Sequence, residues 1–192
     1  MNELDTIVEA LSPVAQIFRD LGVPFYVGGS VASSFHGAMR STRDVDVIAD
    51  LQSRHVPGFL QKLGDEYYAS ETAIRDAIRR KSCFNLIHFP TGYKVDVFAN
   101  RGRVFDRTVF ARSVEVEIGQ ETKLTVPMAT SEDILLAKLA WYREGGEVSE
   151  RQWEDVSILA ELMGDSADMD YLKESARELA VSDLLERLWA SL

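Results

Sequence analysis

The first segment of the chain repeats hydrophobic residues with the period of an α-helix. Between positions 4 and 21, leucine, isoleucine, valine and phenylalanine recur every three or four residues. This spacing places them on one face of a helix. Gly22 and Pro24 follow, and both residue types end helices. We therefore expect a helix over 4–21 that buries its apolar face.

Shorter apolar runs follow, and their alternation or β-branched content favours strands. Phe25–Val27 ends at Gly28 and Gly29, after which Ser30 is expected to cap a short helix through about Ala38. Further helices are expected over 51–63, 72–81 and 103–111, the first disturbed by Pro57. The remaining expected strands are 45–48, 83–89, 94–98, 114–118 and 123–126, with a hairpin turn at 90–93.

The pattern changes at Pro127, beyond which only helical spacing recurs. Thr130 and Asp133 form a capping box for an apolar helix through Tyr142, which Gly145 and Gly146 end. Further helices are expected over 149–163, 168–180 and 182–190. The layout predicts an α+β protein, with a mixed core over 1–127 and a helical region over 128–192 packed on that core.

Composition narrows the class of protein. The chain has 192 residues, of which 46% are hydrophobic and 27% charged, a balance typical of a soluble globular protein. It contains no run of 18 apolar residues, and its first residues are acidic rather than those of a signal peptide. Cys83 is the only cysteine, which excludes an internal disulfide and a cysteine-based zinc site. We expect a cytoplasmic protein that does not enter a membrane.

Charge is distributed unevenly. The formal net charge is −10, yet residues 1–127 carry 15 basic and 16 acidic side chains, and residues 128–192 carry 6 and 15. Residues 75–112 hold nine lysines and arginines against three aspartates. The overall charge argues against non-specific coating of DNA, while a local basic groove remains compatible with it.

Three aspartates on expected strands carry the candidate chemistry. Asp44 and Asp46 are two residues apart, so on a strand they share a face, while Val45 points to the other. Asp96 lies between two valines of another expected strand, an unusual place for an unpaired carboxylate. If the two strands are neighbours, the three carboxylates converge. Such a cluster suits two magnesium ions that bridge a triphosphate and an attacking hydroxyl.

A glycine turn precedes the first acidic pair. Gly28, Gly29 and Ser30 join a strand to a helix, where glycine allows close approach of a phosphate and the helix N-terminus favours anions. The Ser30 hydroxyl can donate to a phosphate oxygen. The turn has neither the G-x-G-x-x-G nor the G-x-x-x-x-G-K-[ST] pattern, so a Rossmann or P-loop site is not expected.

Together these motifs resemble the nucleotidyltransferase superfamily with the polymerase-β-like fold. The resemblance covers residues 25–98 and rests on Gly28-Gly29-Ser30, Phe35-His36-Gly37, Arg40-Ser41-Thr42-Arg43-Asp44-Val45-Asp46-Val47 and Val95-Asp96-Val97. Residues 28–47 and the helices over 131–162 also resemble small bacterial proteins akin to AbiEii, the toxin component of type IV toxin–antitoxin systems. This similarity implies a cognate antitoxin as a partner.

The resemblance implies a role for each candidate residue. Gly28, Gly29 and Ser30 would hold the phosphates of an NTP. Asp44 and Asp46 would ligate both Mg²⁺ ions, and Asp96 would complete the second ion's shell and help to deprotonate the acceptor, so these three are the expected catalytic residues. The expected phosphate contacts outside the turn are Arg40 and Lys138. Asp155 would orient a lysine, approach the metals, or form a surface ion pair with Arg151. Arg143 would assist, or would only favour its helix C-terminus.

The leading hypothesis is a Mg²⁺-dependent transferase that moves a nucleoside monophosphate from an NTP to a hydroxyl. The acceptor would be an RNA (tRNA) end, as in AbiEii-like toxins, reached along a basic track, or a protein hydroxyl. A small molecule of the aminoglycoside or lincosamide kind is the other possibility. The alternative to an enzyme is a catalytically silent binding module that acts as a partner of another protein. A glycosyltransferase is ranked low, because only 43 residues precede Asp44. The expected track comprises Arg75, Arg79, Arg80, Lys81, Arg101, Arg103, Arg107 and Arg112.

Overall fold

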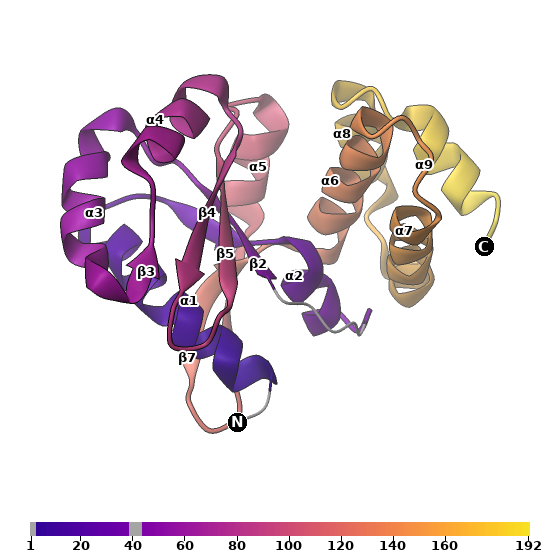
Figure 1. The fold of residues 1–192 in the computed structure, drawn as a ribbon. Helices are drawn as coiled ribbons and strands as arrows, with labels where there is room; N and C mark the ends of the chain where they lie inside the picture. The colour runs from indigo at the N-terminus through magenta and orange to yellow at the C-terminus, as the bar shows by residue number, and fades with distance from the viewer. Residues whose placement is uncertain (1–2, 39–43) are drawn as a thin grey trace.

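The computed structural model describes residues 3–38 and 44–192. Within them, seven strands form one mixed sheet in the order β3-β4-β5-β2-β1-β7-β6 (Figure 1). The strands are β1 (Phe25–Val27), β2 (Asp44–Ala49), β3 (Tyr67–Tyr68), β4 (Cys83–His88), β5 (Lys94–Ala99), β6 (Val114–Ile118) and β7 (Leu124–Met128). The central strands β2 and β5 run parallel, and both pair antiparallel with their outer neighbours β1 and β4.

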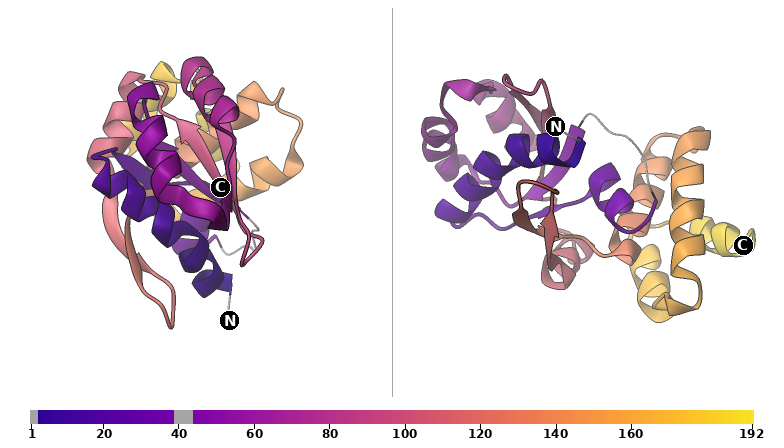
Figure 2. Two further views of the ribbon diagram at one scale, coloured as in Figure 1. Left: turned by 60° about the vertical axis from the view of Figure 1, so that its left-hand side comes forward. Right: turned by 90° about the horizontal axis from the view of Figure 1, so that it is seen from below.

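The helices separate into two groups. Those within the sheet region are α1 (Glu3–Asp20), α2 (Gly29–Phe35), α3 (Val56–Leu63), α4 (Glu71–Arg80) and α5 (Val104–Arg112), and those after the last strand are α6 (Ser131–Glu144), α7 (Glu150–Met163), α8 (Met169–Glu178) and α9 (Ser182–Trp189). Short 3₁₀ turns cover Ser53–His55, Gly64–Glu66 and Gly164–Ser166. The second group forms a helical part beside the sheet (Figures 1 and 2).

The two faces of the central strands differ in polarity, as the sequence predicts. Val45 and Val47 of β2 and Val95 and Val97 of β5 are fully buried on one face, which α1 contacts. The opposite face carries the alternating polar positions, and α2 packs there against β2 and α6. Because successive strand residues point to opposite faces, this core fixes the register that exposes the acidic positions.

The α+β architecture predicted from the sequence is confirmed, with three local differences. Gly28, not Ser30, is the N-cap of α2, so Ser30 lies within the helix. Pro57 lies in the first turn of α3, where its missing N–H costs no hydrogen bond, so it does not disturb that helix. The two-residue strand β3 was not predicted, because so short a segment has no periodicity.

Side-chain contacts connect the helical part to the sheet region. Thr130 caps α6 by accepting a hydrogen bond from the backbone N–H of Asp133, as predicted. The Asp133 carboxylate accepts a hydrogen bond from the Tyr171 hydroxyl of α8. The Arg112 guanidinium of α5 lies 3.9 Å from the centre of the Tyr171 ring. Division of the chain at 127/128 stays a prediction. No helix among the described residues is long and apolar enough to cross a membrane.

Candidate active site

The parallel register of β2 and β5 brings the predicted acidic residues together. Asp46 lies directly opposite Asp96, and Asp44 lies opposite Lys94. Neighbouring strands are about 4.8 Å apart, and residues two apart on one strand about 6.6 Å, so all four side chains occupy one small area of the sheet. The sequence predicted the three carboxylates at this place, but not the lysine among them.

Asp96 is buried, and both of its carboxylate oxygens have protein partners. The Asn85 side-chain amide of β4 donates a hydrogen bond to Oδ1. The Lys94 ammonium lies 2.7 Å from Oδ2, and it also lies 3.6 Å from Oδ2 of Asp44. Lys94 therefore bridges two of the three carboxylates. An aspartate amid valines is stable at the centre of this sheet because a cation and an amide compensate its burial.

The Asp46 carboxylate lies against the glycine turn at the start of α2. Its Oδ2 is so close to Gly29 that a Cβ there would come within 1.7 Å of it, and Gly29 has a φ of +58°. The backbone N–H of Ser30 donates to this carboxylate, while the N–H of Gly28 donates to the Asp46 carbonyl at 3.0 Å. Only glycine satisfies both the backbone angle and the close approach.

The environment of Asp46 is short of positive charge. Burial and the neighbouring carboxylates of Asp44 and Asp96 raise its pKa to about 6. The Ser30 N–H and the positive charge of Lys138 oppose this shift without cancelling it. A carboxylate whose ionisation is this unfavourable in the ligand-free protein gains from any added cation. Electrostatics therefore favour cation binding at Asp46.

Lys138 reaches the same region from the helical part. It is only 8% exposed, and it lines a cavity together with Gly28 and Gly29. Its ammonium forms an ion pair with Asp155 of α7, at 2.8 Å from Oδ2. Of the three interpretations that the sequence left open for Asp155, this ion pair corresponds to the one in which Asp155 orients a lysine.

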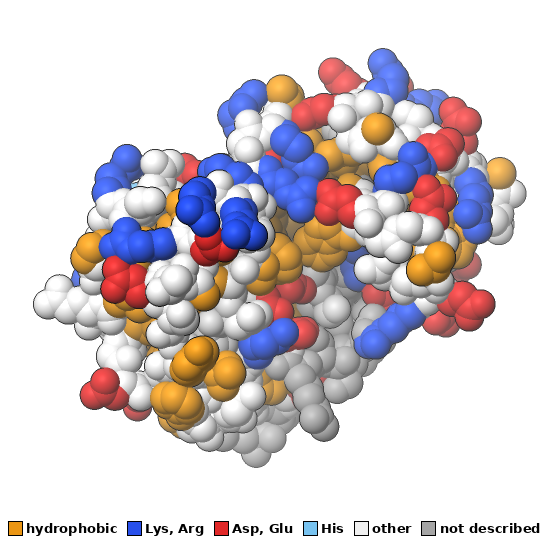
Figure 3. All heavy atoms as spheres, turned by 45° about the horizontal axis from the view of Figure 1, so that its top comes forward, with side chains coloured by type: hydrophobic (Ala, Val, Ile, Leu, Met, Phe, Trp, Pro, Cys, Tyr) orange, Lys and Arg blue, Asp and Glu red, His pale blue; other side chains and the backbone are white. Residues whose placement is uncertain are grey.

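The cavity has a volume of about 270 Å³ and lies between the sheet, α5 and α6. Its sheet wall is the next row of side chains along the strands from the carboxylates, where Phe98 pairs with both Ile48 and Cys83. The Trp141 indole of α6 stacks on the Phe98 ring, with ring centres 5.3 Å apart and planes 27° apart. Figure 3 shows hydrophobic side chains in the hollow between the two parts, with charged groups at its rim.

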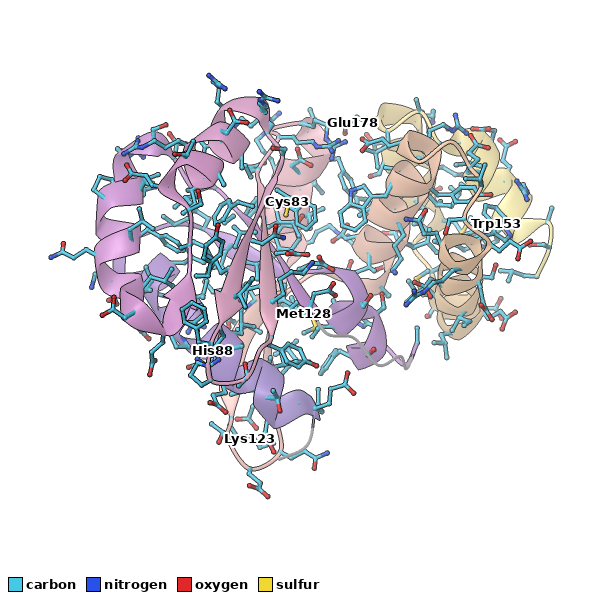
Figure 4. All side chains as sticks on the ribbon, in the orientation of Figure 1. Cys83, His88, Lys123, Met128, Trp153 and Glu178 are labelled. Carbon is cyan, nitrogen blue, oxygen red and sulfur yellow. The ribbon has the colours of Figure 1, made fainter. Side chains whose placement is uncertain are left out.

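Cys83 faces α6 from the sheet (Figure 4). Burial, followed by the charges of Asp96 and Asp46, raises the pKa of its thiol to about 12. A thiol that stays protonated is not a nucleophile. Cys83 therefore acts as a small apolar wall residue of the cavity.

The remaining predicted residues lie elsewhere. Arg40 falls outside the described residues. Arg143 does not line the cavity, and its guanidinium instead pairs with Glu147 and with Asp183. Sequence reasoning missed Lys94 and Asn85, although Lys94 carries a signal, because it precedes Asp96 by two residues and so shares its strand face.

The donor set suits a hard divalent cation such as Mg²⁺. Carboxylate oxygens are its preferred protein ligands, and backbone N–H groups of the glycine turn, which can bind phosphate oxygens, lie beside Asp46. In the described part of the chain, however, no group of three or more His, Cys, Asp or Glu side chains is already arranged around a common metal position. The residues fit a metal chemically, and the two predicted ions stay a prediction.

The sequence matches no protein-family model and no curated protein. Similar solved structures include the antibiotic-resistance factor ANT(2'')-Ia, with 11% identity, a TM-score of 0.53, and 98% of this chain and 95% of that chain covered. Another is an antigenic nucleotidyltransferase-like protein from Paracoccidioides brasiliensis, with 18% identity, a TM-score of 0.54, and coverages of 98% and 93%. At these identities the similarity shows a shared fold. It confirms the predicted nucleotidyltransferase fold with its C-terminal helical part.

Proposed function

We propose that the protein is a nucleotidyltransferase, which transfers a nucleoside monophosphate from an NTP to a hydroxyl acceptor with the help of Mg²⁺. The observation that carries this proposal is the position of the Asp46 carboxylate, which lies beside Asp96 and directly against the backbone of Gly29 and Ser30. Metal ligands and a phosphate-binding turn have to lie side by side in such a site, because a divalent cation held by the carboxylates would supply positive charge next to the phosphates.

In the proposed reaction, the acceptor oxygen attacks the α-phosphorus of the NTP. A new P–O bond forms, the bond between the α- and β-phosphates breaks, and pyrophosphate leaves. The hydroxyl proton passes to a carboxylate of the cluster. Backbone N–H groups at the start of α2 hold the phosphates, and Lys138 balances their negative charge from the helical part. Bound Mg²⁺ would neutralise charge that develops on the phosphoryl oxygens.

The first prediction concerns the nucleotide. Adding Mg²⁺ with an NTP should raise the melting temperature of the protein, because a ligand that binds only the folded state stabilises it. Replacing Ser30 with alanine should raise the NTP dissociation constant by roughly tenfold, the loss of about 1.4 kcal/mol expected for one hydrogen bond to a charged group. Isothermal titration calorimetry measures the NTP dissociation constants of the wild type and of the Ser30→Ala variant.

Ser157→Ala is the matched control, because Ser157 lies on α7 and donates only within that helix, to the Trp153 carbonyl. It should leave the NTP affinity unchanged. No melting shift with any Mg²⁺–NTP pair would contradict the proposed function. Equal NTP affinities of Ser30→Ala and wild type would contradict the role of the serine hydroxyl.

For the acceptor, we propose a small hydroxyl-bearing molecule that enters the apolar cavity beside the carboxylates. Six arginines of the expected RNA track already pair with acidic side chains, which reduces the positive potential available to a nucleic acid. The pairs are Arg75–Glu71, Arg79–Asp76, Arg80–Asp76, Arg101–Glu144, Arg103–Asp106 and Arg112–Glu132. The fold shared with ANT(2'')-Ia, named an antibiotic-resistance factor, supports the same choice.

The second prediction separates the two acceptors. Arg75→Glu together with Arg79→Glu reverses two charges on one face of α4. With a small acceptor, transfer rates at low and moderate salt should equal those of wild type. With an RNA acceptor, the rate should fall and the salt dependence of binding should decrease by about one unit for each lost phosphate contact.

The assay measures transfer of label from an NTP in the presence of Mg²⁺. The acceptor offered is either total cellular RNA or a panel of small hydroxyl compounds. Label in RNA that is sensitive to the double charge reversal would restore the RNA acceptor. An AbiEii-like toxin role with a cognate antitoxin, and a cytoplasmic location, stay predictions of the sequence.

A further inference from the structure

Lys94 is placed where a metal ion would be expected to lie between carboxylates. Its ammonium is 2.7 Å from Asp96 and 3.6 Å from Asp44, two acidic residues on different strands. This position follows from the fold, because Lys94 shares a strand face with Asp96 and lies opposite Asp44 in the parallel register. The lysine is therefore a built-in part of the carboxylate cluster.

The other described lysine near the carboxylates has a different partner. Lys138 pairs with Asp155 at 2.8 Å and approaches the cluster from the helical part. It is thus available to a phosphate at the cavity, whereas Lys94 contacts the carboxylates themselves. Lys138 therefore supplies positive charge to a bound phosphate, and Lys94 supplies it to the protein carboxylates.

Asp96 is the carboxylate least available to an added ion. One oxygen accepts from Asn85 and the other from Lys94, so a metal ion at Asp96 would have to compete with these donors for the carboxylate. Asp46, in contrast, accepts a hydrogen bond from the Ser30 N–H, and no lysine is paired with it in the described residues. The cluster is asymmetric: Lys94 lies on Asp96 and Asp44, and no lysine of the described residues is paired with Asp46.

We propose that the Lys94 ammonium takes the place of one of the two expected metal ions, so that the protein binds a single divalent cation together with its nucleotide. Asp46 is the central ligand of that cation, and Asp96 holds Lys94. The inference rests on the proposed function, and it replaces the two-ion site expected from the sequence with one metal ion and one lysine ammonium. The ammonium also competes with metal ions for Asp44 and Asp96.

The third prediction is the number of ions bound. Electron paramagnetic resonance titration with Mn²⁺, in the presence of one equivalent of a non-hydrolysable NTP analogue per chain, should give one bound ion per wild-type chain. Lys94→Met, which keeps the length of the side chain without its charge, should give two. Without nucleotide, the variant should bind Mn²⁺ at least tenfold more tightly than wild type, because the competing ammonium is gone.

Two matched variants control for folding and for general charge. Lys94→Arg retains the positive charge and should keep one ion. Lys62→Met removes an exposed lysine that pairs with Asp20, outside the carboxylate cluster. This variant should also keep one ion. Circular dichroism checks that each variant is folded, and the wild-type count tests the proposal even if Lys94→Met does not fold.

The outcomes distinguish this inference from the proposed function. Two Mn²⁺ ions on the wild-type chain, or one ion on a folded Lys94→Met, would overturn the role of Lys94 and leave nucleotidyl transfer standing. Absence of Mn²⁺ binding to wild type and variant alike, with and without the analogue, would overturn the proposed function and this inference with it.

Discussion

Replacing Asp46 with asparagine is expected to reduce nucleotidyl transfer by about 10³-fold or more while the fold is retained. Asparagine has the same shape and can still accept the Ser30 N–H, but it removes the charge that a divalent cation needs. Loss of metal-assisted charge stabilisation removes several kcal/mol from the transition state, and each 1.36 kcal/mol is a factor of ten in rate. Transfer of label from an NTP to the acceptor measures the effect.

The same substitution should raise the stability of the metal-free protein. Because the pKa of Asp46 is raised to about 6, the folded state holds its proton more tightly than the unfolded state does. The free energy of unfolding therefore decreases as pH rises between about 4 and 6. At neutral pH, the ionised Asp46 carboxylate destabilises the folded protein. After allowance for solvent screening, we expect Asp46→Asn to gain about 1–2 kcal/mol at pH 7.

Urea denaturation of the metal-free protein at pH 5 and pH 7 tests this expectation. The stabilisation by Asp46→Asn should be larger at pH 7, and added Mg²⁺ with NTP should stabilise wild type but not the variant. Asp65→Asn, at an exposed aspartate outside the site, is the control and should change neither quantity. An active Asp46→Asn protein would remove this carboxylate from the chemistry.

Strand alternation, which is a local property, was sufficient to place Asp44 and Asp46 on one face of a strand. Asp44 and Asp46 had to share a face once β2 was recognised, and valines at the intervening positions identified the buried side. That Asp96 joins them depends on the parallel pairing of β2 with β5, which separates the partners by about 50 residues and has no local signal. The superfamily resemblance, rather than periodicity, supplied that pairing.

Other features depend on tertiary packing and could not be read from the chain. The Phe98–Trp141 stack and the Lys138–Asp155 ion pair each join elements whose relative position is set only by the folded core. Asn85 contacts Asp96 because β4 and β5 form a hairpin, and the hairpin was predicted although this contact was not. The alternation rule that identified the acidic residues could also have identified Lys94, because Lys94 and Asp96 are two residues apart on one strand.

Replacing Gly29 with alanine should be nearly as damaging as removing the Asp46 charge, for a steric reason. The added Cβ would lie 1.7 Å from Asp46 Oδ2, and three atoms of that side chain lie within 2.8 Å of the Cβ position. Asp46 is held by strand β2, so either its carboxylate rotates away or the turn moves from the carboxylates. A displacement of about 1 Å in a reacting group costs roughly 10²-fold in rate, and we expect at least this loss in kcat/KM.

Gly22→Ala separates the steric effect from backbone strain. Gly22 has a φ of +63°, close to the +58° of Gly29, but no atom lies within 4 Å of its Cβ position. Both variants should lose about 1–2 kcal/mol of stability because alanine is strained at positive φ, yet only Gly29→Ala should lose activity and affinity for the Mg²⁺–NTP complex. If the two variants retained equal activity, contact between the glycine turn and Asp46 would not be needed for the reaction, and the proposed meeting of metal ligands and phosphates at this turn would be wrong.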